Sequence, residues 1–413
     1  MVLTSLTTSI VLALFSILMP GVMVLPFTIC YITNKKQQKI IQLSVGMAII
    51  WAAAGFCFRD PASNPDLVRY LAMLKDYADK SFFECINLHY ENLFLVDIYF
   101  FIIAQIGIPQ LLPAISVFVF YFIVFYILED YKIRIGLADG TFGVFLFAAI
   151  SAINFCSIVN GIRWPMAVIV FTLAVYRELI QERKNFWTYL LYILPVFMHF
   201  SMLIFIAVRL ALLIKNKKII VIIGLSAALL PRIFEILAKM ILARPSNFIT
   251  YSFVYFIQRG NMYFKWNVND AGWASTVSKS IYYKVEALYY YAIVALVIFV
   301  FFMLNRKDKN RKMKRSDIFV FYLVALTLVS FTMSAHTYIR FVTPLIICFS
   351  WVCFKFFKCF EHRKNVTIFS YIAMLGAGFI GIYLNLHLLN SMVNLKEYLT
   401  EVFVFGFWGT LIG

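Results

Sequence analysis

The sequence predicts an all-α fold: a polytopic transmembrane helical bundle of about 11–14 membrane helices, counting short or re-entrant ones. The first observation is the composition: 63% of the 413 residues are hydrophobic and only 14% are charged. Such a chain is more apolar than a soluble domain. The second is that apolar runs repeatedly approach the roughly 20 residues that span a bilayer. The third is that lysines and arginines gather in short segments between these runs.

The apolar runs give the expected spans of one integral membrane domain over residues 1–413. We place them at residues 3–33, 40–57, 110–128, 141–159, 164–181, 186–214, 218–241, 282–304, 317–335, 338–357 and 366–389. The run 186–214 is too long for one straight helix, so we expect a short hairpin with Pro195 and His199 at its turn. The run 93–106 is apolar enough to cross, but a crossing would reverse the side of every later loop. We therefore expect it to be re-entrant or to lie against the bundle.

Four basic clusters set the expected orientation, since positively charged loops stay in the cytoplasm. They lie at residues 35–39, 215–218, 306–315 and 355–364. The opposite side then receives a first extracytoplasmic loop at 58–92, a second extracytoplasmic segment at 231–281, and the turns around Asn160, His199 and His336. Within the second segment, residues 231–245 place their charges on one helical face, which predicts an amphipathic helix in the membrane interface.

Charge and cysteine content exclude other classes. The net charge of +17 is carried by loops between apolar runs, so nucleic acid is not an expected partner. The seven cysteines form no CxxC pair and show no metal-ligand spacing. We therefore expect no metal site and no cofactor.

Arg163 lies almost alone between two long apolar runs, where a permanently charged guanidinium is costly unless it serves a site. Gly161 and Pro165 predict a tight turn followed by a helix start, where backbone N–H groups and a positive dipole favour an anion. A two-pronged guanidinium at that place suits a diphosphate, and Asn160 opens the same turn. The alternative is that Arg163 only marks a helix end near the lipid headgroups.

The first outer loop supplies further candidates. Arg59 directly follows an apolar run and can reach a phosphate from the rim of the bilayer, or it can be an ordinary interfacial arginine. Asp66 and Tyr70 fall one turn apart if this stretch is helical and can hydrogen-bond sugar hydroxyls, although such pairs are ordinary on solvated helices. Asp60 or Asp66 can also serve as the base of a related transfer reaction.

Two histidines complete the set of candidates. His199 lies in the middle of an apolar stretch, either as a buried histidine with satisfied hydrogen bonds or as a base or sugar-binding group near the membrane rim. His336 and Arg340 are four residues apart with Tyr338 between them, which repeats the combination of imidazole and guanidinium at a later turn. These three can equally be polar residues at a helix terminus.

Taken in order, these residues resemble the EpsG family, which belongs with the Wzy-type polymerases of bacterial surface polysaccharides. The resemblance covers most of residues 50–345 and rests on order and spacing, because each motif is short and degenerate. Its parts are Arg59 with Asp66 and Tyr70, the turn from Asn160 to Arg163, the segment from Phe197 to Ser201, and the late Arg340. Two places depart from the family's pattern: Trp164 stands where Gln is frequent, and Asn64 and Pro65 stand where a glycine-containing turn is common.

The resemblance implies an integral membrane glycosyltransferase that joins oligosaccharide repeat units carried on undecaprenyl diphosphate, at the outer face of the bacterial cytoplasmic membrane. Arg163 and Arg340 would contact the diphosphate, with Arg59 as a third cation, and His199 would be the base or the group that positions the acceptor. The partners would be the lipid-linked oligosaccharide and membrane lipid, and a regulator of chain length could be a third. The product would be an O-antigen, a capsule or an exopolysaccharide.

Other functions remain open at this stage. A transporter or flippase for lipid-linked sugars would place charges or broken helices near the bilayer midplane and show internal symmetry. Here the unusual charges gather on one expected face, and the sequence shows no repeat. An O-antigen ligase-like enzyme, or a glycosyltransferase that uses a polyprenyl-phosphate sugar, fits the same residues.

The charge pattern makes a prediction about topology. In cysteine labelling of intact cells, residues 60–90 and 245–280 should react from outside, and residues 306–315 should react only after the membrane is permeabilised, because the basic clusters are held in the cytoplasm. Labelling of 306–315 from outside intact cells would overturn this orientation.

Overall fold

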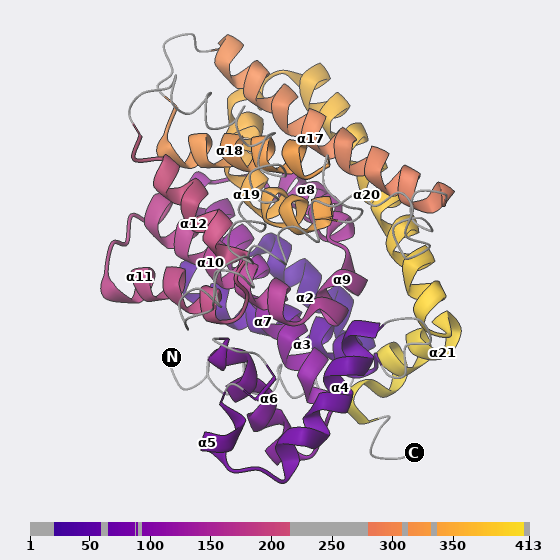
Figure 1. The fold of residues 1–413 in the computed structure, drawn as a ribbon. Helices are drawn as coiled ribbons and strands as arrows, with labels where there is room; N and C mark the ends of the chain where they lie inside the picture. Colours follow the sequence, from indigo (N-terminus) through magenta and orange to yellow (C-terminus); the bar gives the residue numbers. More distant parts are fainter. Residues whose placement is uncertain are drawn as a thin grey trace. The chain divides into compact units, whose positions relative to one another are not determined.

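The computed structural model describes residues 20–58, 65–86, 88–89, 93–214, 280–307, 313–331 and 337–408, and every regular element within them is a helix (Figure 1). Five of these helices are long and apolar enough to cross a membrane, and a bent pair makes a sixth candidate. The predicted all-α polytopic bundle is therefore confirmed. The chain groups into two compact units, each described by itself: unit 1 is Met1–Met202 with Phe357–Gly413, and unit 2 is Leu203–Phe356.

Among the described residues, unit 1 holds most of the helices. Before the break near His199 they are α2 (Pro20–Thr33), η1 (Gln37–Lys39), α3 (Ile40–Phe56), α4 (Pro65–Ala78), α5 (Phe82–Cys85), α6 (Phe94–Ile106), α7 (Leu111–Ile135), α8 (Asp139–Ala152), α9 (Phe155–Gly161), α10 (Arg163–Leu179), α11 (Phe186–Ile193) and η2 (Leu194–Phe197). Late in the chain come α20 (Lys364–Met392), α21 (Leu395–Thr400), the π-helical turn η3 (Glu401–Phe405) and η4 (Gly406–Trp408).

Unit 2 contains α12 (Met202–Ala211) from Leu203 onward, α17 (Ile281–Lys307), α18 (Arg315–Ser330) and α19 (Thr337–Phe360) as far as Phe356. At one end of this unit, Tyr338 near the start of α19 donates a hydrogen bond of 3.0 Å to Glu286 near the start of α17. At the other end Asp317 pairs with Lys355 at 2.6 Å. Residues of the third and fourth basic clusters therefore lie at the same end of this unit.

The predicted spans near 40–57, 110–128, 282–304, 338–357 and 366–389 correspond to α3, α7, α17, α19 and α20, which are the long apolar helices. The run 186–214 is interrupted as expected, because Pro195 lies in the 3-10 turn η2 and the next helix begins only at Met202. Expectations for residues 1–19 and 215–279, including the amphipathic helix, lie outside the described residues. The single membrane domain, the first extracytoplasmic loop and the second extracytoplasmic segment stay predictions.

Helix α6 is too short to cross the membrane. Its 13 residues rise about 20 Å in total, against a hydrocarbon core of about 30 Å. It packs instead against α4 of the first loop, with the rings of Phe100 and Tyr70 5.6 Å apart. This agrees with the expectation that the run 93–106 lies against the bundle.

Helices α7 and α10 run parallel, which separates two ends of unit 1. Near their starts, Ser116 and Met166 approach to 3.3 Å, and near their ends Tyr176 bonds to Asp130. We call these the Arg163 end and the Asp130 end. At the Asp130 end the buried Lys132 pairs with Asp139 at 2.7 Å, which compensates charges that are costly to bury alone.

The basic clusters at 35–39 and 355–364 meet at the Asp130 end. Lys35 lies 4.0 Å from Asp139, and Lys358 donates a hydrogen bond of 3.4 Å to the carbonyl of Gly136. Two clusters that were predicted to share the cytoplasmic side thus lie at one end of unit 1. The Arg163 end is opposite to them.

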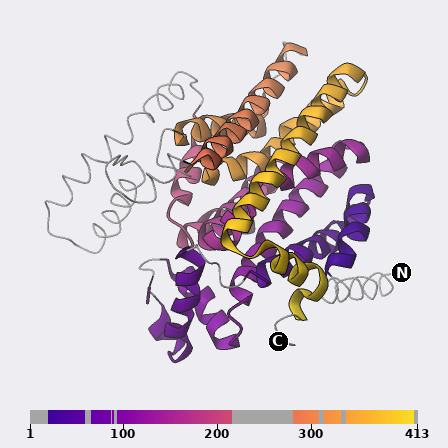
Figure 2. The ribbon, with the colours of Figure 1, turned by 90° about the vertical axis from the view of Figure 1, so that its right-hand side faces the viewer.

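Helix α20 lies along α8, as Figure 2 shows, and its outer side is strongly apolar. Large apolar side chains on it are more than half exposed, and they recur at helical spacing: Ile368, Phe369, Ile372, Phe379 and Tyr383. An exposed apolar stripe of this length is unfavourable in water and suits contact with lipid. It supports the assignment of α20 as a membrane span.

The predicted span 141–159 differs from expectation, because it is not one straight helix. It is broken into α8 and α9, which meet at an angle of 53°. Asn154 lies at the break and caps α9, since its side chain accepts a hydrogen bond of 2.9 Å from the backbone N–H of Ser157. Asparagine favours such caps over a helix interior because its short amide competes for backbone groups.

Asn385 of α20 satisfies the backbone groups that the break leaves open. Its Oδ1 accepts from the N–H of Phe155 at 2.9 Å, and its Nδ2 lies 2.9 Å from the carbonyl oxygen of Ser151 and 3.2 Å from that of Ile153. Backbone polar groups in a membrane need internal partners, because lipid offers none. One side chain therefore makes a broken span possible at this point.

Asn385→Leu should destabilise the protein, because a leucine of similar size leaves buried N–H and C=O groups unpaired, at about 1–3 kcal/mol each. The measurement is the unfolding temperature of the purified chain in detergent. Asn390→Leu is the matched control, because Asn390 is exposed on the same helix. Equal unfolding temperatures for the two variants would show that the bonds to the break contribute no stability.

Candidate functional site

The turn between α9 and α10 forms the centre of the candidate site. Helix α9 ends at Gly161, α10 begins at Arg163, and Ile162 joins them with φ 31° and ψ −69°. The first intrahelical bond of α10 runs from Met166 N to Ile162 O. The backbone N–H groups before Met166 therefore have no acceptor within α10. The positive end of the helix dipole lies at the same place and favours negative charge.

Ile162 is strained, because a β-branched residue rarely adopts a positive φ. Such strain costs on the order of 1–3 kcal/mol and persists only where the surroundings enforce it. The side chain of Ile162 is fully buried, and its packing supplies that enforcement. Gly161 is tightly packed here, since a Cβ at this position would lie 3.2 Å from Cδ of Pro165 and the proline ring would have to shift by a few tenths of an ångström.

Tyr70 brings the first loop to this turn. The Nε of Arg163 donates to the Tyr70 hydroxyl at 3.3 Å, and the guanidinium carbon lies 5.6 Å from the centre of the tyrosine ring. The ring is buried, so it gives the half-buried Arg163 a fixed support. Two sequence candidates that are 93 residues apart are thus in direct contact.

Arg69 is a second cation beside the same ring, and the sequence analysis missed it. Its guanidinium carbon lies 5.3 Å from the centre of the Tyr70 ring. Asp66, which is one turn from Tyr70 on α4 as expected, forms an ion pair with Arg69 at 2.8 Å. The guanidinium groups of Arg69 and Arg163 are therefore gathered around one aromatic ring, with one carboxylate beside them.

Asn160 lies at the C-terminal end of α9 and is buried. Its Nδ2 approaches the sulfur of Met392, at the end of α20, to 3.4 Å. Its Oδ1 is buried and has no hydrogen-bond partner among the described residues. An unpaired buried amide oxygen is costly, so Asn160 is a place where a hydroxyl of a ligand would gain a bond.

His199 follows η2, which packs against α6 and α10. The rings of Phe197 and Phe94 lie 4.7 Å apart, which fixes this turn against the start of α6. His199 is half-buried, and its Nδ1 lies 2.7 Å from the hydroxyl oxygen of Ser201. It belongs to unit 1, as do Asp66, Tyr70, Asn160 and Arg163.

The late candidates belong to unit 2. Tyr338 is buried and donates to the carboxylate of Glu286, and its ring stacks on Phe331 at 4.9 Å. Arg340 is half-buried on the same helix, α19. A site shared by Arg340 and Arg163 stays a prediction, and Arg59, Asp60 and His336 lie outside the described residues.

Among the buried carboxylates that escaped the sequence analysis, two are each embedded in an apolar or aromatic run. Asp97 of α6 accepts a hydrogen bond of 2.5 Å from Tyr77, and both side chains are fully buried. Glu286 of α17 is the second. The only sequence signal for either residue was an isolated acidic side chain inside a hydrophobic run.

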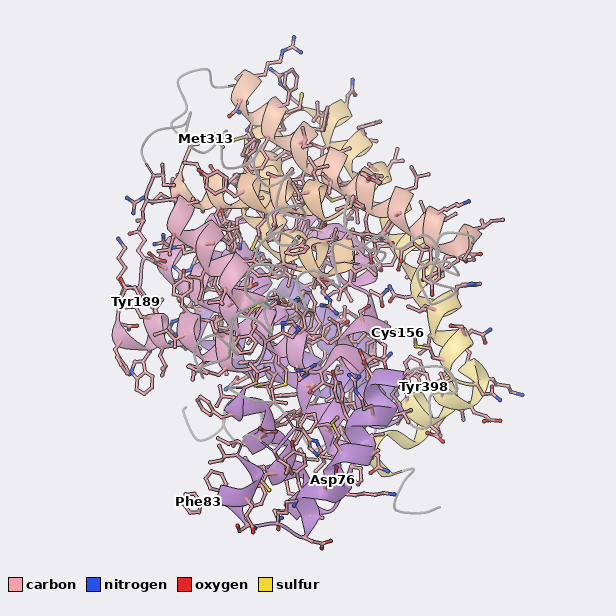
Figure 3. The ribbon with its side chains drawn as sticks, in the orientation of Figure 1. Asp76, Phe83, Cys156, Tyr189, Met313 and Tyr398 are labelled. Atoms are coloured by element: carbon pink, nitrogen blue, oxygen red, sulfur yellow. The ribbon has the colours of Figure 1, made fainter. Side chains whose placement is uncertain are left out.

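Within unit 1, helix α21 packs against the end of α3. The hydroxyl of Tyr398, labelled in Figure 3, donates to the carbonyl of Ala54 at 2.8 Å, and its ring lies 5.9 Å from that of Phe58. Within the described residues, no group of three or more His, Cys, Asp or Glu side chains is placed to hold a metal ion. Comparison with known protein families, with curated proteins and with solved structures finds no match to this chain.

Ile162→Gly tests whether packing or backbone strain dominates at the turn. Glycine relieves the φ strain, but losing a fully buried isoleucine costs about 2–5 kcal/mol even for truncation to alanine, so we expect a lower unfolding temperature. Ile162→Val, which keeps most of the side chain, should cost about 0.5–1.5 kcal/mol. A glycine variant more stable than the wild type would show that strain is the larger effect.

Proposed function

We propose that this protein is a membrane glycosyltransferase that polymerises undecaprenyl-diphosphate-linked oligosaccharide repeat units of a surface polysaccharide, at the outer face of the bacterial cytoplasmic membrane. The observation that carries the proposal is the cluster of Arg163, Arg69 and Tyr70 at the start of α10. The order of motifs that resembles the EpsG family supports the same conclusion. The polymer would be an O-antigen, a capsule or an exopolysaccharide.

The cluster has the chemistry that such a transfer needs. The bond between the anomeric carbon of the growing chain and the diphosphate oxygen breaks, and the diphosphate leaves with the bonding electrons. A hydroxyl oxygen of the incoming unit forms the new glycosidic bond and gives up its proton to a general base, for which His199 is the candidate. Guanidinium groups that fork onto phosphate oxygens, together with a helix N-terminus, stabilise the charge that develops on the leaving group.

The placement of the basic clusters supports an outer location. Clusters 35–39 and 355–364 meet at the Asp130 end of unit 1, while Arg163 begins α10 at the opposite end. If the clusters face the cytoplasm, as the positive-inside rule requires, the Arg163 end faces outward. A lipid-linked unit that has already crossed the membrane would meet the arginines there.

A transporter or flippase is the main alternative, and the broken span α8–α9 is the feature that favours it. Discontinuous helices in transporters use their unwound backbone to coordinate substrate or ions. Here the N–H of Phe155 and the carbonyls of Ser151 and Ile153 are instead bonded to Asn385. This occupation favours a structural break, and the enzyme proposal, over a transport site.

An O-antigen ligase-like enzyme and a glycosyltransferase that uses a polyprenyl-phosphate sugar are the alternatives within enzymes. The deletion strain separates the classes. Loss of a polymerase leaves single repeat units at the outer face, whereas loss of a flippase traps them in the cytoplasmic leaflet. A ligase mutant would make long chains that remain on their lipid carrier.

Arg163→Lys, expressed in the deletion strain, should give markedly shorter polymer ladders at wild-type protein level. Lysine keeps the charge and still reaches the interface, but it loses the planar fork that matches phosphate oxygens. Arg163→Ala should reduce polymer further. Arg177→Lys is the matched control, because it lies on the same helix but near the Asp130 end, where its Nε donates to Thr188.

The readout is the ladder length on a gel, with membrane-fraction protein measured for each variant. Normal ladders from Arg163→Lys would mean that the arginine is an interfacial anchor. Wild-type ladders from Arg163→Ala would remove it from the site.

A further inference from the structure

Glu129 of α7 lies at the Asp130 end of unit 1, and its side chain is fully buried. An ionised carboxylate in such surroundings needs a cation beside it, because an unpaired buried charge is very costly. Two cations follow on the same helix, Lys132 and Arg134. Their own bonds decide whether either can serve Glu129.

Lys132 has no N–H group left for Glu129. A lysine ammonium carries three donors, and each of them has a partner here. Lys132 Nζ donates to the carbonyl of Ile32, donates to that of Asn34 at 2.9 Å, and pairs with the carboxylate of Asp139 at 2.7 Å. The charge of Lys132 is therefore balanced by Asp139.

Arg134 and Lys35 are likewise paired with other carboxylates. Arg134 Nε donates to Asp130 Oδ2 at 2.6 Å. Lys35, on the turn after α2, is mostly exposed and lies 4.0 Å from Asp139. Within the part of the chain that the structure describes, no ion pair includes Glu129. Its carboxyl group is therefore buried without a cation of its own.

Asn34 shows which oxygen of Glu129 accepts a hydrogen bond. Its Oδ1 accepts from the backbone N–H of Lys36 at 2.9 Å, so the other end of the amide is the donor Nδ2, which bonds to Oε1 of Glu129. Oε2 has no hydrogen-bond partner among the described residues. Neither has the buried hydroxyl oxygen of Ser44, which faces the same carboxyl group from α3. A proton on Oε2 can therefore be donated to Ser44.

We propose that Glu129 is a proton-binding site, in which the side chain is held as a neutral carboxylic acid with its proton on Oε2 and Ser44 as the acceptor. Neutralisation removes a buried charge that no cation compensates. It leaves Asp130 and Asp139 ionised beside their cations. The site lies at the end of unit 1 opposite to Arg163, so its protonation is independent of the proposed function.

The other groups around Glu129 do not change this charge balance. Helix α3 contains no titratable side chain, and Tyr31 of α2 is a phenol whose hydroxyl donates to the carbonyl of Phe125 at 2.7 Å. Helix α10 contributes Tyr176, which bonds to Asp130. Lys35 is solvated, and the remaining two cations and two carboxylates balance each other. The charged groups near Glu129 are thus Lys35, Asp130, Lys132, Arg134 and Asp139.

Infrared spectroscopy detects the proton directly, because the C=O stretch of a protonated carboxyl group is separate from the stretches of a carboxylate. The purified full chain is measured in detergent at a pH of about 7.5, where a glutamate with the ordinary pKa of about 4.3 is ionised. We expect the wild type to show a protonated-carboxyl band that ¹³C-labelled glutamate shifts and that is lost in Glu129→Gln. Ser44→Ala should keep the band but move it to higher frequency, because the acid loses its acceptor. Glu182→Gln is the control, since Glu182 is exposed after the end of α10, and it should leave the band unchanged.

The unfolding temperature gives a second test. In the unfolded chain Glu129 is in water and ionises, so the unfolded state binds one proton fewer and the stability of the wild type falls as the pH rises. Glu129→Gln has no proton to lose, and its amide offers both an acceptor for Asn34 and a donor for Ser44. Its unfolding temperature should be close to that of the wild type at a pH of about 5 and exceed it by a margin that grows as the pH rises. Glu182→Gln should follow the wild type throughout.

Absence of the band from the wild type would show that Glu129 is ionised and would overturn the proposal. A band that persists unchanged in Glu129→Gln would belong to another residue and would have the same consequence. A Glu129→Gln variant that does not fold, or that unfolds below the wild type at every pH, would also contradict it, because the neutral amide reproduces the bonds of the neutral acid.

Discussion

The break between α8 and α9 depends on one amide side chain. A helix that bends by 53° inside an apolar environment exposes N–H and C=O groups that lipid cannot satisfy. Asn385 matches both kinds of group at once, because an amide has an acceptor and a donor on the same plane. The direction of α9 follows from this, and so does the position of the turn that carries Arg163.

The cations at the two ends of unit 1 lie in different surroundings. At the Asp130 end, cations such as Lys132 and Arg134 have carboxylate partners, which neutralise them in buried or half-buried surroundings. At the Arg163 end, Arg69 pairs with Asp66, and the buried phenol of Tyr70 positions the guanidinium of Arg163. The first arrangement suits a stable protein end, and the second gathers two guanidinium groups around one aromatic ring, which is the feature on which the proposed function rests.

The long spans could be predicted because α3, α7 and α20 keep their apolar character over a bilayer's thickness. The isolation of Arg163 was also visible in the sequence, whereas its contact with Tyr70 of the first loop was not. The break in α8–α9 was not, because it depends on Asn385, which lies 230 residues away from Phe155. Arg69 was missed because an arginine on a polar helix is ordinary until its neighbours are known, and the grouping of the chain into two units left no mark in hydropathy.

The dependence of α9 on α20 also has a consequence for biosynthesis. The broken span leaves the ribosome first, and its partner follows 230 residues later, which at cellular synthesis rates is roughly 10–50 s. During that interval the open backbone groups of the bend have to find temporary partners, such as water, interfacial headgroups or an insertion factor. The arginine turn therefore reaches its final geometry only after α20 has been inserted, and the candidate site is completed late in the synthesis of the chain.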